Sequence, residues 1–272
     1  MKPVRQLSLF VMACSVSLVA AIPQALYAQT TDLALSKSAL SEPAIVAQST
    51  GVPLSSDEVL GRLDAVPVFA ILSENNSPVL ANIEQDGEQV KLIGFWLDRA
   101  AAQVALNTIQ TANPEVGSRA RMVPIAMSAA LRMAAEQQEQ NGIRFRIWPS
   151  SEIVETAIAL LRETDGEEID SFPGVPLFFG QSDEGVLTIE ADGSEVVPFF
   201  FSDKDLQDTL DLAREENSDI ADKTEIRVTS LDSVMNSMVA PDAEASVQKI
   251  EFVPSRLAIE DARGLAVENQ SN

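Results

Sequence analysis

The sequence predicts an α+β fold built from two similar halves, each with the element order βββαβαβα, packed about a pseudo-twofold axis. Short apolar segments of strand length alternate with longer amphipathic segments of helix length along the chain. Short sequence patterns recur in the same order in residues 55–163 and 175–266. Hydrophobic residues make up 46% of the chain and charged residues 22%, which is typical of a globular protein rather than a disordered one.

The first half, residues 55–163, begins with a helix because Ser55 is a favourable N-cap and two acidic residues follow it. Asp98 caps the next helix, Asn141-Gly142 ends a third, and Pro149-Ser150 opens a fourth. Asp86-Gly87 is typical of a β-hairpin turn. The predicted helices cover residues 57–63, 99–112, 128–140 and 151–163, and the predicted strands cover 66–72, 79–83, 90–96, 121–125 and 143–148.

An acidic linker loop, residues 164–174, leads to the second half, residues 175–266. Asp192-Gly193 predicts a second hairpin turn, Ser202-Asp203 caps a helix, and Pro254-Ser255 opens the last helix. The predicted strands cover residues 175–179, 186–190, 195–200, 225–229 and 249–253, and the predicted helices cover 203–216, 231–239 and 256–266. Residues 267–272 are expected to form a frayed tail.

The repeat rests on three ordered matches. Val66-Pro67-Val68-Phe69 matches Val175-Pro176-Leu177-Phe178 at an offset of 109 residues. Phe95-Trp96 followed by Asp98 matches Phe200-Phe201 followed by Asp203 at an offset of 105, and Ile147–Ser150 matches Phe252–Ser255 at the same offset. These matches favour an internal duplication. The alternative is that two α+β segments share common turn residues by chance.

The N-terminus is predicted to be a signal peptide over residues 1–28, followed by a flexible leader over 29–54. Lys2 and Arg5 precede an apolar stretch, which ends in small residues at Ala28. The alternative reading is a lipid-anchored protein with Cys14 in a lipoprotein box, but the apolar stretch continues well past Cys14, so lipidation is not expected. The signal predicts export, and the mature chain then has no cysteine and no membrane span.

Charge and composition exclude several classes of function. The chain carries 41 acidic and 19 basic residues, a net charge of −22, so nucleic acid is not an expected partner. It has no histidine, which excludes Ser-His-Asp catalysis and His-ligated metals. No nucleotide-binding motif is present, and the acidic run Asp165–Asp170 lacks the alternating ligands of a calcium loop. We expect no catalytic residue, no cofactor and no metal, although a hydrolase with carboxylates that converge in space stays open.

Aromatic residues are the candidates for binding another polypeptide. They alternate along predicted strands, so neighbouring side chains lie on opposite faces and one face is free to bind a client unless helices cover it. The alternative is that all of them are buried in the core, and Trp148 is expected to be a packing residue. The candidate polypeptide-binding residues are Phe95, Trp96, Phe179, Phe199, Phe200 and Phe201.

Five segments in order carry a family resemblance: Val66–Phe69, Met122–Ile125, Ile143–Pro149, Pro173–Phe178 and Val197–Leu206. Together, over roughly residues 58–240, they resemble the Tic22-like family. The chain departs from the family pattern at Ser150-Ser151. The resemblance implies a non-enzymatic protein with two structurally similar halves. It also implies plastid relatives in the intermembrane space on the import path, and cyanobacterial relatives in the periplasm that support outer-membrane biogenesis.

The expected function is therefore that of a soluble chaperone-like factor. It would bind unfolded or precursor polypeptides and support protein transport and outer-membrane biogenesis, with barrel-assembly or translocon components as further partners. The alternative is a non-catalytic scaffold or adaptor that docks one such component. A negative surface around apolar patches suits the chaperone-like role, because it keeps a complex with an unfolded client soluble.

Overall fold

The structure is a computed structural model, and it describes residues 16–17, 51–85, 88–165, 169–183, 185–191, 193–215 and 219–271. The predicted signal peptide, apart from residues 16–17, and the leader up to residue 50 lie outside the described residues. So do parts of the two predicted hairpin turns and of the acidic linker.

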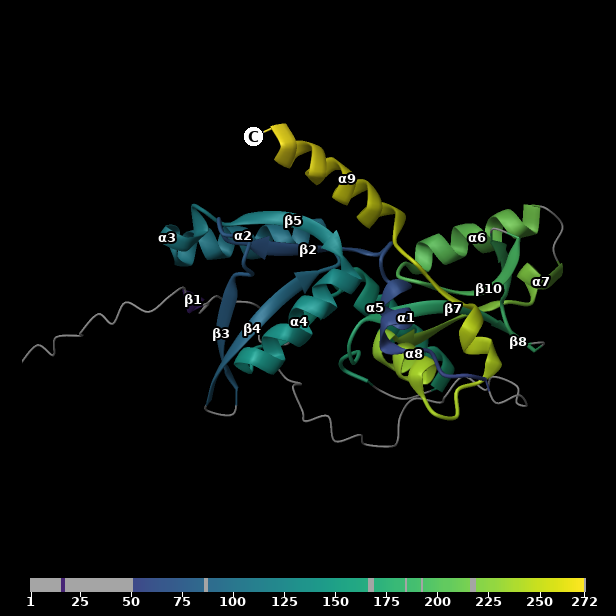
Figure 1. Ribbon diagram of the computed structural model, residues 1–272. Coiled ribbons are helices and arrows are strands. Elements are labelled where there is room, and N and C mark those ends of the chain that lie inside the picture. Colours follow the sequence, from purple (N-terminus) through teal and green to yellow (C-terminus); the bar gives the residue numbers. More distant parts are fainter. Residues whose placement is uncertain are drawn as a thin grey trace, which may run out of the picture.

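The elements of the first half closely follow the prediction (Figure 1). After β1 (Val16–Ser17) they are α1 (Ser56–Gly61), β2 (Pro67–Leu72), β3 (Leu80–Gln85), β4 (Glu88–Trp96), α2 (Arg99–Ala112), α3 (Pro114–Gly117), β5 (Arg121–Ala126), α4 (Met127–Asn141), β6 (Arg144–Trp148) and α5 (Ser151–Asp165). Ser55 and Glu58 form the capping box of α1, and Gly142 ends α4 with a left-handed backbone at φ 63°.

The second half runs in the same order, with one predicted strand split in two. Its elements are β7 (Pro176–Ser182), β8 (Gly185–Val186), β9 (Ile189–Ala191), β10 (Ser194–Phe200), α6 (Asp203–Glu215), α7 (Asp219–Asp222), β11 (Glu225–Ser230), α8 (Leu231–Val239), the 3₁₀ helix η2 (Ala245–Lys249), β12 (Ile250–Val253) and α9 (Arg256–Ser271). The short helices α3, α7 and η2 were not predicted from the sequence.

The frayed tail expected over residues 267–272 is wrong, because α9 continues to Ser271. No helix-breaking residue follows Ala266, and two contacts hold the last turns on the first half. The Arg99 guanidinium lies 2.7 Å from a Glu268 carboxylate oxygen, and the Asn269 side-chain amide donates to the Met122 carbonyl at 3.1 Å.

The two sheets have equivalent strand pairing. In the first sheet, β4 lies between β2, which is antiparallel to it, and β6, which is parallel, and β5 pairs with the far edge of β2. In the second sheet, β10 lies in the same way between β7 and β12, and β11 pairs with β7. The α+β fold is thus confirmed. A duplication in the chain's history and a pseudo-twofold axis stay predictions.

Strand register corrects one of the three repeat matches. Phe69 pairs with Trp96, and its equivalent Phe178 pairs with Phe200. Trp96 is therefore equivalent to Phe200 rather than Phe201, an offset of 104 and not 105. The caps agree, since Asp98 accepts from the Ala101 N–H and Ser202 accepts from the Asp205 N–H. The sequence match equated Asp98 with Asp203 because both are acids. In the structure Asp98 is equivalent to Ser202, because each of these two residues caps the helix that follows it.

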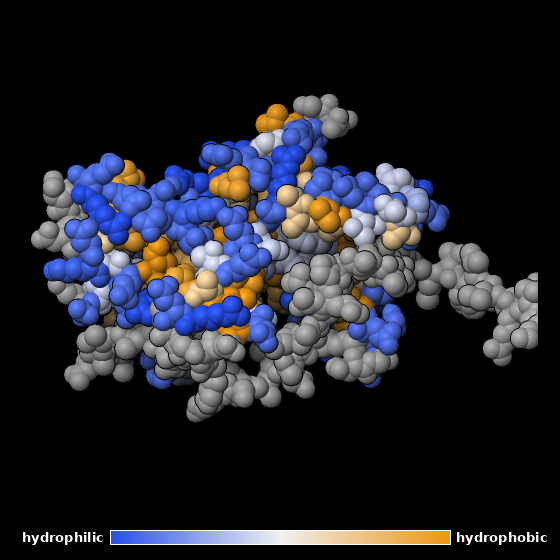
Figure 2. Space-filling model, turned by 180° about the vertical axis from the view of Figure 1, so that it is seen from behind, coloured by the Kyte–Doolittle hydropathy of each residue, from blue (hydrophilic) through white to orange (hydrophobic). Residues whose placement is uncertain are grey.

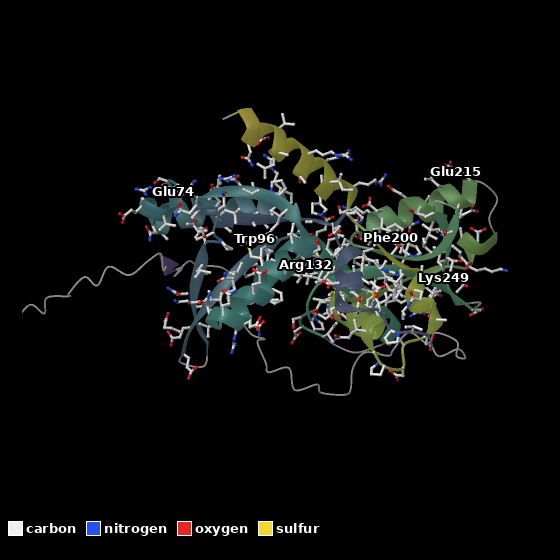
Figure 3. All side chains as sticks on the ribbon, viewed as in Figure 1. Glu74, Trp96, Arg132, Phe200, Glu215 and Lys249 are labelled. Atoms are coloured by element: carbon white, nitrogen blue, oxygen red, sulfur yellow. The ribbon has the colours of Figure 1, made fainter. Side chains whose placement is uncertain are left out.

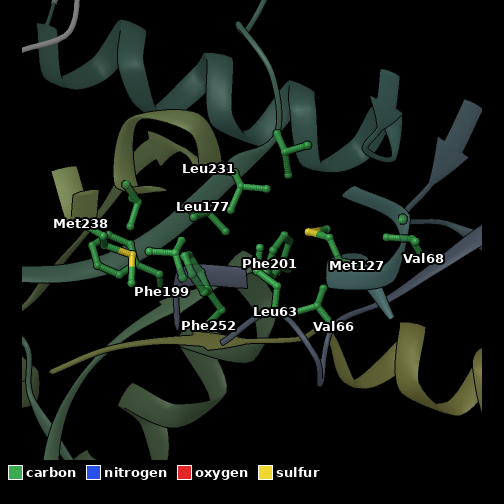
Figure 4. Packing of buried hydrophobic residues seen from close by; sticks show 14 of the residues in the cluster. Leu63, Val66, Val68, Met127, Leu177, Phe199, Phe201, Leu231, Met238 and Phe252 are labelled. Carbon is green, nitrogen blue, oxygen red and sulfur yellow. The ribbon is translucent and has the colours of Figure 1, made fainter. Parts of the chain in front are cut away.

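The inner faces of the two sheets share one core, which α1, α4 and α8 cover (Figure 4). Phe95, Met127, Leu177, Phe199 and Met238 are among its members and come from both halves. The Phe179 and Phe199 rings lie 5.3 Å apart in a tilted arrangement. The last residues of the predicted leader also reach this core, where Leu54 is buried and its N–H donates to the Met238 carbonyl at 2.8 Å.

The last helix of each half packs on the sheet of the other half. Helix α5 follows β6 of the first sheet but contacts β7 and β11 of the second. Helix α9 follows β12 of the second sheet but lies over β2 and β5 of the first, and Figure 1 shows it crossing between the halves. The two halves are therefore interlocked by a reciprocal exchange of helices.

Arg62 adds a polar connection between the halves. Its guanidinium, at the end of α1, donates to the backbone carbonyls of Val247 at 3.3 Å and Gln248 at 2.9 Å, and also to that of Ile250. We expect Arg62→Ala to lower the free energy of unfolding by about 1–2 kcal/mol, because the carbonyls lose a charged donor. Urea denaturation measures this change.

Arg132→Ala is the matched control, since its pairing with Asp57 at 3.4 Å is exposed to solvent. An exposed pair contributes at most about 1 kcal/mol, and often nothing measurable. Equal losses for the two variants would contradict the role assigned to Arg62.

Candidate polypeptide-binding face

The structure places five of the six candidate aromatic residues in the core. Phe95, Phe179, Phe199 and Phe201 belong to the shared inner core, and each is at most 5% exposed. Phe200 is 3% exposed on the opposite, outer face of the second sheet, while Trp96 is half-buried on the outer face of the first. Figure 3 shows Trp96 and Phe200 in their separate halves. Contact between any of the five phenylalanines and a client would require the fold to open, so their binding role stays a prediction.

Trp96 stacks on Trp148 at the edge of the first sheet. The two ring centroids are 5.1 Å apart and the planes differ by 15°. The residues pair across β4 and β6, so both side chains lie on the same face. Gly94, two residues before Trp96 on that face, provides the space, because a Cβ there would lie 2.6 Å from ring atoms of both tryptophans. Both indoles remain half-buried.

A cation and an edge strand adjoin the tryptophan stack. The Arg146 guanidinium carbon lies 5.7 Å from the centroid of the Trp148 ring, within the range of a cation–π contact. Phe145, on the opposite face of β6, is 38% exposed. Within the described chain, β6 pairs with β4 alone, so one edge of its backbone has no strand partner. An extended polypeptide can add to such an edge.

The tryptophan stack continues into a covered apolar surface, which we call the first outer face. It consists of Phe69, Ile71, Trp96, Met122 and Trp148 on the sheet. Helix α2 covers it with Leu106 and Ile109, and α9 covers it with Leu265. The side chains of the first outer face are therefore half-buried at the two tryptophans and buried under α9.

On the equivalent surface of the second sheet, the second outer face, two helices bury the phenylalanines, while Ile226, Val228 and Val253 are half-buried. Phe178 and Phe200 are at most 3% exposed beneath α5 and α6. Val253 takes the place of Trp148, so no second indole stacks there. The tryptophan stack is therefore confined to the first half. Figure 2 shows that other hydrophobic surface gathers near the middle of the rear face, with hydrophilic residues around it.

A cleft of about 550 Å³ lies where four helices begin, between the two halves. Asp98, Ser150, Ser202 and Ser255 cap α2, α5, α6 and α9 there, and each accepts a backbone N–H of its own helix. The other charged residues of the lining are mainly acidic, with Glu152, Asp203, Asp205, Asp208, Glu260 and Asp261 against Lys204 and Arg256. The capping side chains already accept hydrogen bonds from backbone N–H groups at the N-termini of these helices, and the acidic residues add negative charge. The cleft therefore disfavours anions.

Arg256 fixes the start of α9 at this cleft. Its Nε donates to Asp205 at 2.7 Å, its backbone N–H donates to the same carboxylate at 2.9 Å, and its Nη2 donates to Asp208. The Asp205 hydrogen bond, followed by that of Asp208, raises the pKa of the guanidinium above its ordinary value. Two carboxylates of the cleft are thus engaged in structural contacts.

Asp261 of α9 makes the docking of this helix depend on pH. Partial burial, together with the nearby Asp98 and Glu260 carboxylates, raises its pKa above the ordinary value, while Arg99 acts in the opposite direction. The folded state therefore binds the proton more tightly than the unfolded state, and stability rises as pH falls through the raised pKa. We expect Asp261→Asn to protect α9 amides from hydrogen exchange at neutral pH. This advantage should vanish below the ordinary pKa of aspartate, and protection independent of pH would contradict the assignment.

A family profile described as the Tic22-like family matches residues 6–261. The chain belongs to the Tic22-like family. This Tic22-like chain is 28% identical over 164 residues to the Arabidopsis thaliana protein TIC 22-like, chloroplastic. That match covers 60% of the chain and 49% of the relative, so the chain spans about half the length of this curated relative.

Two solved structures share the fold of the Tic22-like chain. Anabaena Tic22, described as a protein-transport protein, superposes with a TM-score of 0.64 at 22% identity, covering 78% of this chain and 97% of that one. Tic22 from Plasmodium falciparum superposes with a TM-score of 0.60 at 19% identity, covering 77% and 98%. At these identities the likeness establishes the fold and nothing about the site.

Trp148 was expected to be a packing residue, and it packs on Trp96. Gly94 and Arg146, which adjoin the tryptophan stack in this Tic22-like chain, were not among the candidate residues. The available signal was the alternation in β6, which puts Arg146 and Trp148 on one face, and the two-residue spacing of Gly94 and Trp96.

In the described part of the chain, no three His, Cys, Asp or Glu side chains are grouped as metal ligands. None of the described helices has the length and hydropathy needed to cross a membrane.

Proposed function

We propose that this chain is a chaperone-like protein-transport factor that binds unfolded or transiting polypeptides at the first outer face. In this proposal it is exported by residues 1–28 and acts in the periplasm in support of outer-membrane biogenesis. Barrel-assembly or translocon components are further partners. Family membership and the transport description of the Anabaena structure support the transport role.

The observation that carries the proposal is the half-buried tryptophan stack beside an edge of β6 along which the described residues place no further strand. Stacked indoles offer a large apolar contact area with little loss of side-chain freedom. The neighbouring edge of β6 offers backbone hydrogen bonds to an extended chain of any sequence. A net charge of −22 keeps a complex with an unfolded client apart from other complexes. Together these features suit reversible binding that depends little on client sequence.

Photo-crosslinking tests the location of binding. A benzophenone side chain is placed at Trp96 in one variant and at the equivalent Phe200 in another, and each is irradiated with several unrelated unfolded proteins. We expect crosslinks from position 96 and not from position 200, because Phe200 lies beneath α5 and α6. Crosslinks of equal yield from both positions would contradict binding at the first outer face.

An aggregation assay tests the function itself. A chaperone-like factor protects several unrelated unfolded proteins from aggregation, and its two tryptophans, both in the stack, report the binding through their emission. A chain that protects none of them but binds one folded envelope component would instead be a scaffold.

A further inference from the structure

Helices α5 and α9 occupy equivalent positions and can be compared residue by residue. The Ile153 N–H donates to the Ser150 hydroxyl at the start of α5, and the Ala258 N–H donates to the Ser255 hydroxyl at the start of α9. The helices therefore align at an offset of 105 residues. Each covers the outer face of the sheet in the opposite half.

Helix α9 carries the smaller apolar surface of the two. Five large apolar side chains of α5 pack on the second outer face, Ile153, Val154, Ile158, Leu160 and Leu161. Helix α9 has Ile259 and Leu265 at two of the equivalent positions, but Ala258, Arg263 and Ala266 at the other three, and it contributes only Leu265 and Ala262 to the cluster on the first outer face. Leu265 is the one large side chain of α9 that is fully buried against the first outer face. The first outer face is thus held closed by a weaker cover.

The attachment of α9 is uneven along its length. Arg256 clamps the start of α9 to Asp205 and Asp208. Its far end is held by the exposed Arg99–Glu268 pair and by Asn269. Helix ends with few buried contacts open locally at low cost, so α9 can swing away while Arg256 keeps its start in place.

Opening α9 would expose Phe69, Ile71 and Met122, which are at most 4% exposed in the closed state. These residues are continuous with the half-buried Trp96. The same geometry that seats α9 would then seat another helix, with apolar residues at the spacing of Ala258, Ala262 and Leu265 and an acid that meets Arg99.

We propose that α9 is a displaceable cover and that the first outer face beneath it binds an amphipathic helix of another polypeptide, one with bulky apolar residues where α9 has Ala258 and Ala266. This inference rests on the proposed polypeptide-binding function at the same face. A second copy of the chain is the less favourable occupant, because its α9 offers identical contacts while the tethered helix has the higher effective concentration.

The probe is a peptide of residues 256–271 with Ala258→Ile and Ala266→Leu, the side chains that α5 has at the equivalent positions, and the control peptide has the unchanged sequence. Fluorescence anisotropy measures binding to the full chain with Cys14→Ser, and tryptophan emission reports contact at the first outer face. We expect the substituted peptide to bind at least about tenfold more tightly than the control peptide. Equal affinities would overturn the proposal.

A lock on α9 tests displacement directly. Arg99→Cys and Glu268→Cys place two thiols where the ion pair lies, and a short bifunctional thiol reagent joins them. The same variant treated with a monofunctional reagent is the matched control. We expect the joined form to bind the peptide at least about tenfold more weakly, since the open state is no longer populated. Equal binding by the two forms would overturn the proposal.

A loosened cover should act in the opposite direction. Leu265→Ala raises the population of the open state and is expected to raise the apparent affinity about threefold to tenfold. Val267→Ala, on the same helix but 65% exposed, should leave the affinity unchanged. Equal effects of the two substitutions would overturn the proposal.

The remaining outcomes separate this inference from the proposed function. A chain that protects unfolded proteins but does not bind the peptide contradicts the displaceable cover alone. A chain that binds the peptide but protects no unfolded protein contradicts the chaperone-like function alone. Dimers in which residue 99 of one copy is joined to residue 268 of another would identify a second copy as the occupant and contradict the proposal.

Discussion

Phe95→Ala is expected to lower the free energy of unfolding by about 3–5 kcal/mol, the range for removal of a buried phenylalanine ring. The Phe95 side chain is 0% exposed and lies in the core that the inner faces of both sheets share. A cavity there removes contacts made by strands and helices of both halves. The effect should therefore extend beyond the first half to the whole molecule.

Urea denaturation followed by tryptophan emission and by far-ultraviolet circular dichroism measures this loss. Both tryptophans lie in the first half, while circular dichroism reports both halves. A shared core predicts that the two transitions coincide in the wild type and in the variant. Phe145→Ala, at a ring that is 38% exposed, should cost at most about 1 kcal/mol. Separate transitions for the two signals would contradict a single cooperative core.

Gly94→Ala is expected to lower the free energy of unfolding by about 1–3 kcal/mol, because it overfills a packed site. The new methyl group would lie 2.6 Å from Cζ3 of Trp148 and from Cη2 of Trp96, so at least one ring must move. The backbone conformation at Gly94 is not the cause, since its φ is not positive. The substitution therefore tests the stacking geometry directly.

The emission spectrum reports the displacement, because the chain's two tryptophans are the two stacked rings. We expect a shift to longer wavelength as an indole becomes more exposed, and weaker client binding if the stack is the contact surface. Gly61→Ala is the control, since a Cβ at that glycine meets no atom within 4 Å. An unchanged spectrum for Gly94→Ala would mean that the rings are not held over Gly94.

Local patterns were sufficient to predict most of the elements. Caps such as Ser55 and Asp98 act within a few residues, so the helices they begin are readable from the sequence. The equivalence between residues of β4 and residues of β10 could not be predicted in this way, because acids follow both strands at similar distances. Only the pairing of Phe69 with Trp96 and of Phe178 with Phe200 fixes it.

The exchange of α5 and α9 could not be predicted from periodicity. An amphipathic pattern shows that a helix has an apolar face and does not show which sheet it covers. The same limit applies to the site. Alternation placed Phe199 and Phe200 on opposite faces, but whether the Phe200 face is covered depends in part on α5, which comes from the first half of the chain.

The exchanged helices also set the order in which the molecule can be completed during synthesis. Phe69 and Ile71 are among the first core residues to be made, yet Leu265, which helps to cover them, comes near the end of the chain. A first half folding as it is synthesised can cover part of this surface with α2 but must leave the part beneath α9 uncovered until the second half has been made. Contacts between residues so far apart in sequence also slow folding. The protein would therefore resemble its own proposed clients for much of its synthesis, with an apolar surface awaiting a helix.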